Sequence, residues 1–332
     1  MDKRVKQLVD EALDAKILQS EDIAYLLSWP ADSEESFAIQ WAARSLSRKL
    51  GKAEIHGQVG INSAACPCNC AFCSFAASNG VFKETQVKPL EEILHQANSL
   101  IEQGTNAIYL MTTANFDFAN FIKIGSQVRR ELGPDTVMVA NMGDFDLEQA
   151  RALKAAGFNG VYHAVRLGEG LVTRIPPQKR LETIRHAKQA GLQIGTCVEP
   201  VGPEHSIQEL VEKILITRQM QPGFSGAMRR INIPGSPLEQ YGMVSELRMA
   251  QILAVVRLAM GHNVTGNCTH EPCVSGVIAG ANLLWAEAGS NPRDTARDTE
   301  NSRGFDPKRC REILNEAEFP VLNGPSLFFN EP

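Results

Sequence analysis

No run of apolar residues in the 332-residue sequence approaches the roughly 20 that a membrane-spanning helix needs. The first residues, MDKRVKQLVDEALDAKI, mix charges of both signs at helical spacing. They therefore have neither the apolar centre of a signal peptide nor the acid-poor composition of a transit peptide. We expect a cytoplasmic protein with no membrane partner.

Blocks of basic residues are also missing, because 33 Lys and Arg stand against 38 Asp and Glu, for a net charge of -5. Neutralising the phosphates of a nucleic acid needs clustered cations, so we expect no nucleic-acid partner. The composition, 43% hydrophobic and 21% charged, excludes intrinsic disorder, collagen and a coiled coil. The sequence indicates a globular protein whose length suits one α/β barrel or two smaller domains.

Cysteine is sparse except in one segment. Four of the eight cysteines lie within eight positions, and the other four are spread over the second half of the chain; in order they are Cys66, Cys68, Cys70, Cys73, Cys197, Cys268, Cys273 and Cys310. In a reducing cytosol, clustered thiols indicate metal binding or redox chemistry before structural disulfides.

The pattern of apolar residues changes near residue 54. Before it, apolar residues recur every three or four positions behind N-cap signals at Ser20-Glu21-Asp22 and Ser33-Glu34-Glu35, which predicts helices. After it, short apolar runs alternate with amphipathic stretches. The predicted strands are Ile55–Ile61, Ala107–Met111, Val137–Ala140, Gly160–Val165, Gln193–Val198, Arg230–Ile233, Asn263–Thr265 and Asn282–Ala286. The predicted helices between and after them are Pro89–Gln103, Phe118–Leu132, Leu147–Ala156, Gln178–Ala190, Ile207–Gln219, Ser245–Met260 and Lys308–Glu316, with C-cap glycines at 104, 157 and 191.

Eight strands that alternate with helices predict an α/β fold, a (β/α)8 TIM-type barrel that is complete or nearly so. An open, doubly wound sheet remains the alternative, since periodicity does not detect closure. We expect an N-terminal helical extension over residues 1–53, the barrel over 54–290 and a tail over 291–332 that packs on the barrel.

The cysteine cluster follows the first predicted strand. Cys66, Cys70 and Cys73 have the spacing C-x3-C-x2-C, and three thiolates this close can hold three irons of a four-iron four-sulfur cluster. The fourth iron is then open to a small chelating molecule. A zinc site is the alternative, with Cys268, His270 and Cys273 as a second group of ligands. Cys68 is an extra thiol, either a free side chain or an alternative ligand.

This motif, with Phe72 directly before Cys73 and a strand before the loop, resembles the radical S-adenosylmethionine (SAM) superfamily. The stretch Ile55-His-Gly-Gln-Val-Gly-Ile-Asn-Ser resembles the branch that contains biotin synthase, the hydrogenase-cofactor maturase and methylornithine synthase. Looser matches to that branch are Arg180-Leu-Glu-Thr-Ile, Pro234-Gly-Ser-Pro-Leu238 and Gly280-Ala-Asn282, so that the resemblance covers about residues 5–320.

The resemblance implies a [4Fe-4S] cluster on Cys66, Cys70 and Cys73, with SAM chelated to the fourth iron. One electron from the cluster would cleave SAM to a 5'-deoxyadenosyl radical, which abstracts hydrogen from a small-molecule substrate. It also implies a reducing electron donor such as ferredoxin or flavodoxin, and it allows a homodimer. A non-catalytic iron–sulfur carrier is the alternative of another class.

In βα barrels, catalytic and binding residues lie at the carboxyl ends of the strands. The residues that we expect to contact SAM on this resemblance are Phe72, Thr112, Thr113, Arg166, Glu169, Glu199 and Asn232. A guanidinium binds carboxylates bidentately, which suits Arg166, although a salt bridge between Arg166 and Glu169 is an equal alternative. A buried Glu199 would be costly without a partner, and ribose hydroxyls or a substrate amine would supply one.

A second group of cysteines suggests a second centre. Cys197, Cys268 and Cys273 follow the fifth and seventh strands, and the resemblance to biotin synthase, which carries an auxiliary iron–sulfur cluster as sulfur donor, makes them candidate ligands. Separate packed thiols are the alternative. Sulfur insertion therefore competes with rearrangement or fragmentation of an amino-acid-derived substrate, as in methylornithine synthase or the maturase.

Overall fold

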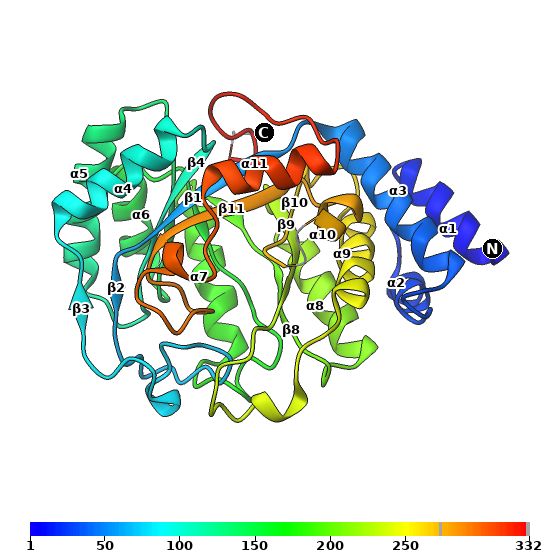
Figure 1. The fold of residues 1–332 in the computed structure, drawn as a ribbon, viewed down its shortest axis with the longest axis horizontal. Coiled ribbons are helices and arrows are strands. Elements are labelled where there is room, and N and C mark those ends of the chain that lie inside the picture. The colour runs from blue at the N-terminus through cyan, green and yellow to red at the C-terminus, as the bar shows by residue number, and fades with distance from the viewer. Residues whose placement is uncertain (272–273, 330–332) are drawn as a thin grey trace.

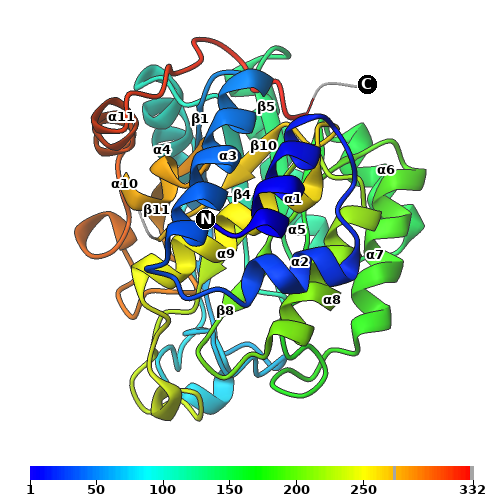
Figure 2. The ribbon, with the colours of Figure 1, turned by 90° about the vertical axis from the view of Figure 1, so that its right-hand side faces the viewer.

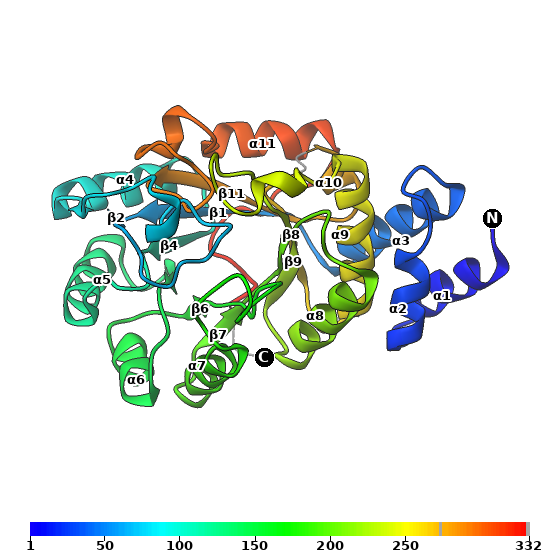
Figure 3. The same ribbon diagram turned by 90° about the horizontal axis from the view of Figure 1, so that it is seen from below.

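The computed structural model describes residues 1–271 and 274–329, and within them eight parallel strand positions close into a barrel surrounded by helices (Figure 3). The strand order around the barrel is β1, β4, β5, β6, β7 continued by β8, β9, β10 and β11, and β11 pairs back with β1. The strands are β1 Glu54–Gly60, β4 Ala107–Met111, β5 Val137–Asn141, β6 Gly160–Tyr162, β7 Gln193–Gly195, β8 Val198–Val201, β9 Phe224–Arg229, β10 Gly266–Cys268 and β11 Leu283–Gly289. The predicted TIM-type barrel is confirmed.

Helices follow the strands as the amphipathic stretches predict. They are α4 Leu90–Glu102, α5 Phe118–Leu132, α6 Leu147–Ala155, α7 Pro177–Gln189, α8 Ile207–Gln219, α9 Glu246–Met260, α10 Val274–Ile278 and α11 Pro307–Glu316. Each of the three predicted C-cap glycines has a positive φ. Single-turn 3-10 helices cover Ala77–Asn79, Glu239–Tyr241 and Thr299–Asn301, and the short strands β2 Asn62–Ser63 and β3 Gln86–Val87 pair antiparallel outside the barrel.

The first three helices lie outside the ring (Figure 2). They are α1 Lys3–Leu13, α2 Ser20–Leu27 and α3 Glu34–Leu50, and they share one hydrophobic core with α8 and α9. Because α9 is covered on both sides, its residues from Met249 to Met260 are all buried. The N-terminal segment therefore completes the burial of an apolar helix that a bare barrel would expose.

The end of the chain fills the amino-terminal end of the barrel. Phe328 and Phe329 are buried there in the same cluster as Phe224 and Trp285. The backbone N–H of Leu327 donates to Oε1 of Glu54 at 2.8 Å. In Figure 1 this tail runs along the edge of the barrel opposite to the loop that carries the cysteines. The barrel interior is thus packed at one end and open at the other.

Three strand assignments were wrong. The sixth strand is Phe224–Arg229 and not Arg230–Ile233, and the seventh is Gly266–Cys268 and not Asn263–Thr265. The fifth is divided, since residues 196 and 197 interrupt it between β7 and β8. These strands contain Ser, Gly and Asn, which have weak β-propensity, and tertiary pairing with neighbouring strands overrides that preference. Within the described residues, no helix is long and apolar enough to cross a membrane.

Candidate active site

A deep cavity, the chamber, opens at the carboxyl ends of the strands, where βα barrels place their functional residues. It encloses about 1170 Å³ including its open mouth. Its walls come from the cysteine loop and from nearly every strand end. The polar residues that line it are Gln58, Cys66, Cys68, Cys70, Cys73, Thr112, Thr113, Asn141, Tyr162, Arg166, Arg180, Glu199, Arg229, Arg230, His270, Glu287, Asn291 and Arg293.

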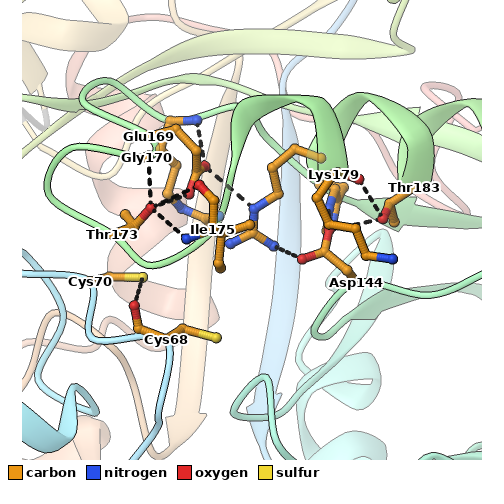
Figure 4. Close-up of polar contacts among 12 residues, drawn as sticks. Cys68, Cys70, Asp144, Glu169, Gly170, Thr173, Ile175, Lys179 and Thr183 are labelled. Carbon is orange, nitrogen blue, oxygen red and sulfur yellow. Dashed lines mark hydrogen bonds and ion pairs between the residues drawn. The ribbon is translucent and has the colours of Figure 1, made fainter.

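Backbone hydrogen bonds within the cysteine loop determine its conformation. The N–H of Cys66 donates to the carbonyl of Phe75 at 2.7 Å, and the N–H of Cys73 donates to the carbonyl of Cys70 at 2.9 Å. A second loop crosses above it, because the N–H of Arg174 donates to the carbonyl of Cys68 at 2.9 Å. Figure 4 shows Cys68 and Cys70 lying below this second loop. The fold therefore fixes the thiols at the chamber wall.

The thiols differ in their ionisation. A hydrogen bond from Cys68 lowers the pKa of Cys66 to about 6, while the pKa of Cys68 is correspondingly raised. Burial raises the pKa of Cys70, and it raises the pKa of Cys73 to about 12. Cys66 is thus the thiolate of the pair and Cys68 its donor. Burial favours the protonated thiol at Cys70 and Cys73, and a nearby cation would be needed to favour their thiolate forms.

The donor set fits an iron–sulfur cluster better than a single metal ion. Cys66, Cys70 and Cys73 all line the chamber, which has room for an inorganic cluster and a further ligand. Among residues 1–271 and 274–329, no group of three or more His, Cys, Asp or Glu is gathered closely enough to hold one ion. A cluster spreads its three ligands over three irons and so needs wider spacing than zinc does.

A buried charge network stands beside the cysteine loop (Figure 4). Arg180 of α7 contacts Asp144, with Nη1 3.0 Å from Oδ2, and Glu169, with Nε 3.3 Å from Oε2. Oδ1 of Asp144 also accepts from Thr183 at 2.8 Å and lies 3.0 Å from Nε2 of His163. Glu169 does not line the chamber. The structure therefore places it behind the wall, where it orients Arg180.

Arg166 and Glu199 form the charged pair that faces the chamber. Nε of Arg166 lies 3.5 Å from Oε1 of Glu199, whose Oε2 accepts from the Tyr162 hydroxyl at 2.8 Å. Arg166 contacts Glu169 through its backbone: its N–H donates to Oε2 of Glu169 at 3.0 Å, and its carbonyl accepts from the N–H of Glu169 at 3.1 Å. Burial raises the pKa of Glu199, although Arg166 and Tyr162 oppose this shift. The predicted alternative, a side-chain salt bridge between Arg166 and Glu169, does not form.

The remaining predicted contacts divide into two groups. Phe72, Thr112 and Thr113 line the chamber, and the hydroxyl of Thr112 is buried there without a protein partner. Asn232 lies beyond the end of β9, where its Oδ1 accepts from Nη1 of Arg230 at 3.1 Å. It does not line the chamber. The predicted strand Arg230–Ile233, which contains Asn232, was wrong, because the sixth strand ends at Arg229.

The structure adds a second charged pair that the sequence did not single out. Nη2 of Arg293 lies 2.7 Å from Oε2 of Glu287 and 3.0 Å from Nδ1 of His270. The ring of His270 stacks on Trp285, with centroids 5.5 Å apart. Burial raises the pKa of Glu287 and lowers that of His270 well below its usual value. The predicted last strand stopped at Ala286, one residue short of Glu287, which hid this signal.

Of the three candidate ligands of a second iron–sulfur centre, two lie together in the structure. Sγ of Cys197 lies 2.6 Å from Sγ of Cys268, and both residues are fully buried. Neither lines the chamber, whose wall includes their neighbour Tyr162. Cys273 lies outside the described residues.

Comparison with known proteins agrees with this site. Residues 63–214 match the family model of the radical SAM superfamily. The chain therefore carries a radical SAM domain over these residues, which include the cysteine loop. It is 26% identical over 270 residues to the biotin synthase of Desulforudis audaxviator (strain MP104C), a match that covers 77% of this chain and 80% of that one. The biotin synthase of Clostridioides difficile (strain 630) is 25% identical over 272 residues, covering 77% and 82%.

Two solved structures share the whole architecture. Methylornithine synthase (PylB) superposes with a TM-score of 0.81 at 20% identity, over 97% of this chain and 98% of that one. The FeFe-hydrogenase maturase HydG from Carboxydothermus hydrogenoformans has a TM-score of 0.77 at 17% identity, over 99% and 81%. At these identities the likeness is one of fold. The chain thus carries a radical SAM domain and is similar to the biotin synthase-like branch, a group that uses a [4Fe-4S] cluster and SAM.

Proposed function

We propose that this radical SAM enzyme abstracts a hydrogen atom from a small charged molecule, and that Cys66, Cys70 and Cys73 ligate its cluster. When bound, the cluster and SAM supply the electron and the sulfonium bond from which the 5'-deoxyadenosyl radical arises. The observation that carries the proposal is that the three thiols and the buried Glu287–Arg293 pair line one chamber.

At the SAM end, three features support the assignment. Arg166 presents a guanidinium suited to the carboxylate of an amino acid. The orphaned hydroxyl of Thr112 is a buried polar group that a ligand would satisfy. Phe72 adds an apolar surface beside the thiols. We propose these side chains, with Thr113 and Glu199, as SAM contacts, and Glu169 as a residue that acts through Arg180.

At the substrate end, Arg293 and Glu287 are a cation and an anion held in the barrel interior. They pair with each other, with Nη2 and Oε2 2.7 Å apart, and both line the chamber, where a substrate with its own anion and cation could bind to the two charges. This favours an amino-acid-derived substrate and a rearrangement or fragmentation. Sulfur insertion is the second candidate, favoured by the similarity to biotin synthases and by the two thiols below the chamber.

The cluster assignment has a direct test. The protein is reconstituted anaerobically with iron and sulfide, its iron is counted, and 5'-deoxyadenosine is assayed after SAM and dithionite are added. About four irons per chain with product is expected. Bound iron without 5'-deoxyadenosine would instead identify an iron–sulfur carrier, and zinc without product would reject the proposal. Ferredoxin or flavodoxin then replaces dithionite to identify the donor.

The substrate class has a separate test. The reconstituted enzyme is incubated with SAM, dithionite and, in separate reactions, each common amino acid or the sulfur-free precursor of biotin in perdeuterated form, and deuterium in 5'-deoxyadenosine is measured by mass spectrometry. Transfer from one of them, weakened at least 10-fold in Arg293→Gln, is expected. Lys308→Gln, on the exposed face of α11, is the control. Transfer only from the sulfur-free precursor of biotin would favour the second candidate.

A further inference from the structure

Two thiols meet in the middle of the barrel. Cys197 follows β7, and Cys268 ends β10, 71 residues later. Each is 0% exposed, and their sulfur atoms are 2.6 Å apart. This is closer than sulfur atoms approach in an ordinary contact and close to the roughly 2.05 Å of a disulfide bond. The fold has therefore brought two distant cysteines into position to react with each other.

Gly226 explains how they meet. In the register of the sheet Cys268 pairs with Gly226, and on the other side of β9 Val198, directly after Cys197, pairs with Ala227. Gly226 consequently lies between the two cysteines, and it has no side chain of its own. Its φ of +146° disfavours any other residue, and an added Cβ would overlap the backbone of Cys268.

The surroundings of the pair do not offer further metal ligands. The thiols belong to a tightly packed cluster with Tyr109, Tyr162 and Trp285. Within the two described stretches of chain, no third His, Cys, Asp or Glu joins them to form a metal-binding group. Two thiols in direct contact and packed among aromatic rings suit a covalent bond to each other, and among the described residues no third ligand favours an inorganic cluster instead.

The pair also lies close in the chain to two side chains of the chamber wall. Glu199 and His270 each come two positions after one of the cysteines, near the carboxyl ends of their strands. Both line the chamber. A bond between the sulfur atoms would therefore fix the spacing of Glu199 and His270 across β9.

We propose that Cys197 and Cys268 form a reversible internal cross-link, a dithiol in the reduced protein and a disulfide after oxidation by a peroxide. One thiol loses its proton and is oxidised by the peroxide to a sulfenic acid, with release of water. The sulfur of the other attacks it, the S–S bond forms, and a second water leaves. Two thiols and one hydrogen peroxide thus give one disulfide and two waters. The cross-link does not depend on the proposed function.

The test uses the reduced full-length protein without added iron. It is treated with hydrogen peroxide, quenched, alkylated in denaturant and digested for mass spectrometry. A peptide pair joined through Cys197 and Cys268 is expected, and dithiothreitol should release it. The link should persist in Cys310→Ala, which removes a buried thiol from another part of the core. The proposal would be overturned if Cys197 of the wild-type protein is recovered in alkylated form under conditions that oxidise the cysteines of the loop over residues 66–73.

A second measurement separates the cross-link from an auxiliary cluster. A variant with Cys66, Cys70 and Cys73 all replaced by Ala is reconstituted with iron and sulfide. No bound iron, together with the oxidised cross-link, is expected. Iron that remains in this variant and disappears on Cys268→Ala would show a second cluster on these thiols and contradict the proposal.

Discussion

Arg180 and Asp144 form a buried ion pair, with Nη1 and Oδ2 3.0 Å apart, that joins α7 to the segment after β5. Glu169 contacts the same guanidinium from the loop after β6. Three chain segments around the cysteine loop are thereby tied to one side chain (Figure 4). The wall of the chamber depends on a charge that burial makes expensive to leave unpaired.

Replacing Arg180 should therefore be severe. Arg180→Met leaves two buried carboxylates without their cation, and we expect the free energy of unfolding, measured in urea, to fall by about 3–5 kcal/mol. Arg180→Lys should lose less. The control is Arg309→Met. The side chains of Arg309 and its partner Glu312 are both about half exposed, so this substitution should change the free energy of unfolding by less than about 0.5 kcal/mol. Equal effects of the two Met variants would contradict this account.

Acid should destabilise the fold through His163. Burial lowers the pKa of this imidazole to about 4, only partly offset by its hydrogen bond to Asp144, with Arg180 and Arg166 adding like charge. The unfolded chain, with an ordinary histidine pKa near 6.5, binds more protons between these values, so stability falls as the pH falls. From pH 7 to 5 we expect a loss of roughly 2 kcal/mol in urea unfolding. His163→Gln should flatten this part of the profile; an unchanged slope would show that other groups are responsible.

The cysteines of the loop should separate by role. Cys66→Ala, Cys70→Ala and Cys73→Ala should each abolish 5'-deoxyadenosine formation and lower the iron content, because each removes one ligand of a cluster that has only three. Cys68→Ala should keep both, since Cys68 serves as hydrogen-bond donor to Cys66. An inactive Cys68→Ala beside an active Cys66→Ala would reverse the ligand assignment.

Gly226→Ala should cost at least about 2 kcal/mol in urea unfolding, because strain at its positive φ adds to the overlap with Cys268. Gly80→Ala is the matched control. Its φ is also positive, at +65°, but nothing lies within 4 Å of an added Cβ, so only the backbone penalty of about 1 kcal/mol applies. Similar losses of stability in the two variants would mean that β10 does not pack closely against Gly226.

The sequence predicted the barrel and its helices well, because their signals are local. Helices α5 and α8 have the predicted bounds, since apolar spacing and caps determine both. The strands β9 and β10 were misplaced because FSGAMR and GNC contain few apolar residues, and only pairing with neighbours makes them strands. Such pairing is a long-range property that no local pattern records.

The residues of the candidate site also divide into those that a local sequence pattern predicted and those that only long-range contacts bring together. The cysteine spacing is local, and the three thiols line the chamber, while their role as cluster ligands stays a prediction. By contrast, Glu287 and Arg293 are brought to His270 by barrel closure, and Cys197 reaches Cys268 only because Gly226 lies between them. These contacts join residues from different strands. The sequence shows the chemical type of each of these side chains, but it does not show that they lie close together in the fold.

Phe328 and Phe329 pack at the amino-terminal end of the barrel, and this affects how small molecules enter and leave the chamber. Because that end is plugged, the mouth beside the cysteines serves for arrival and departure alike. Trp285 belongs both to this aromatic cluster and to the chamber wall. If the substrate binds at Arg293 and Glu287 as proposed, it shares one mouth with SAM, and we expect the two to bind in a compulsory order.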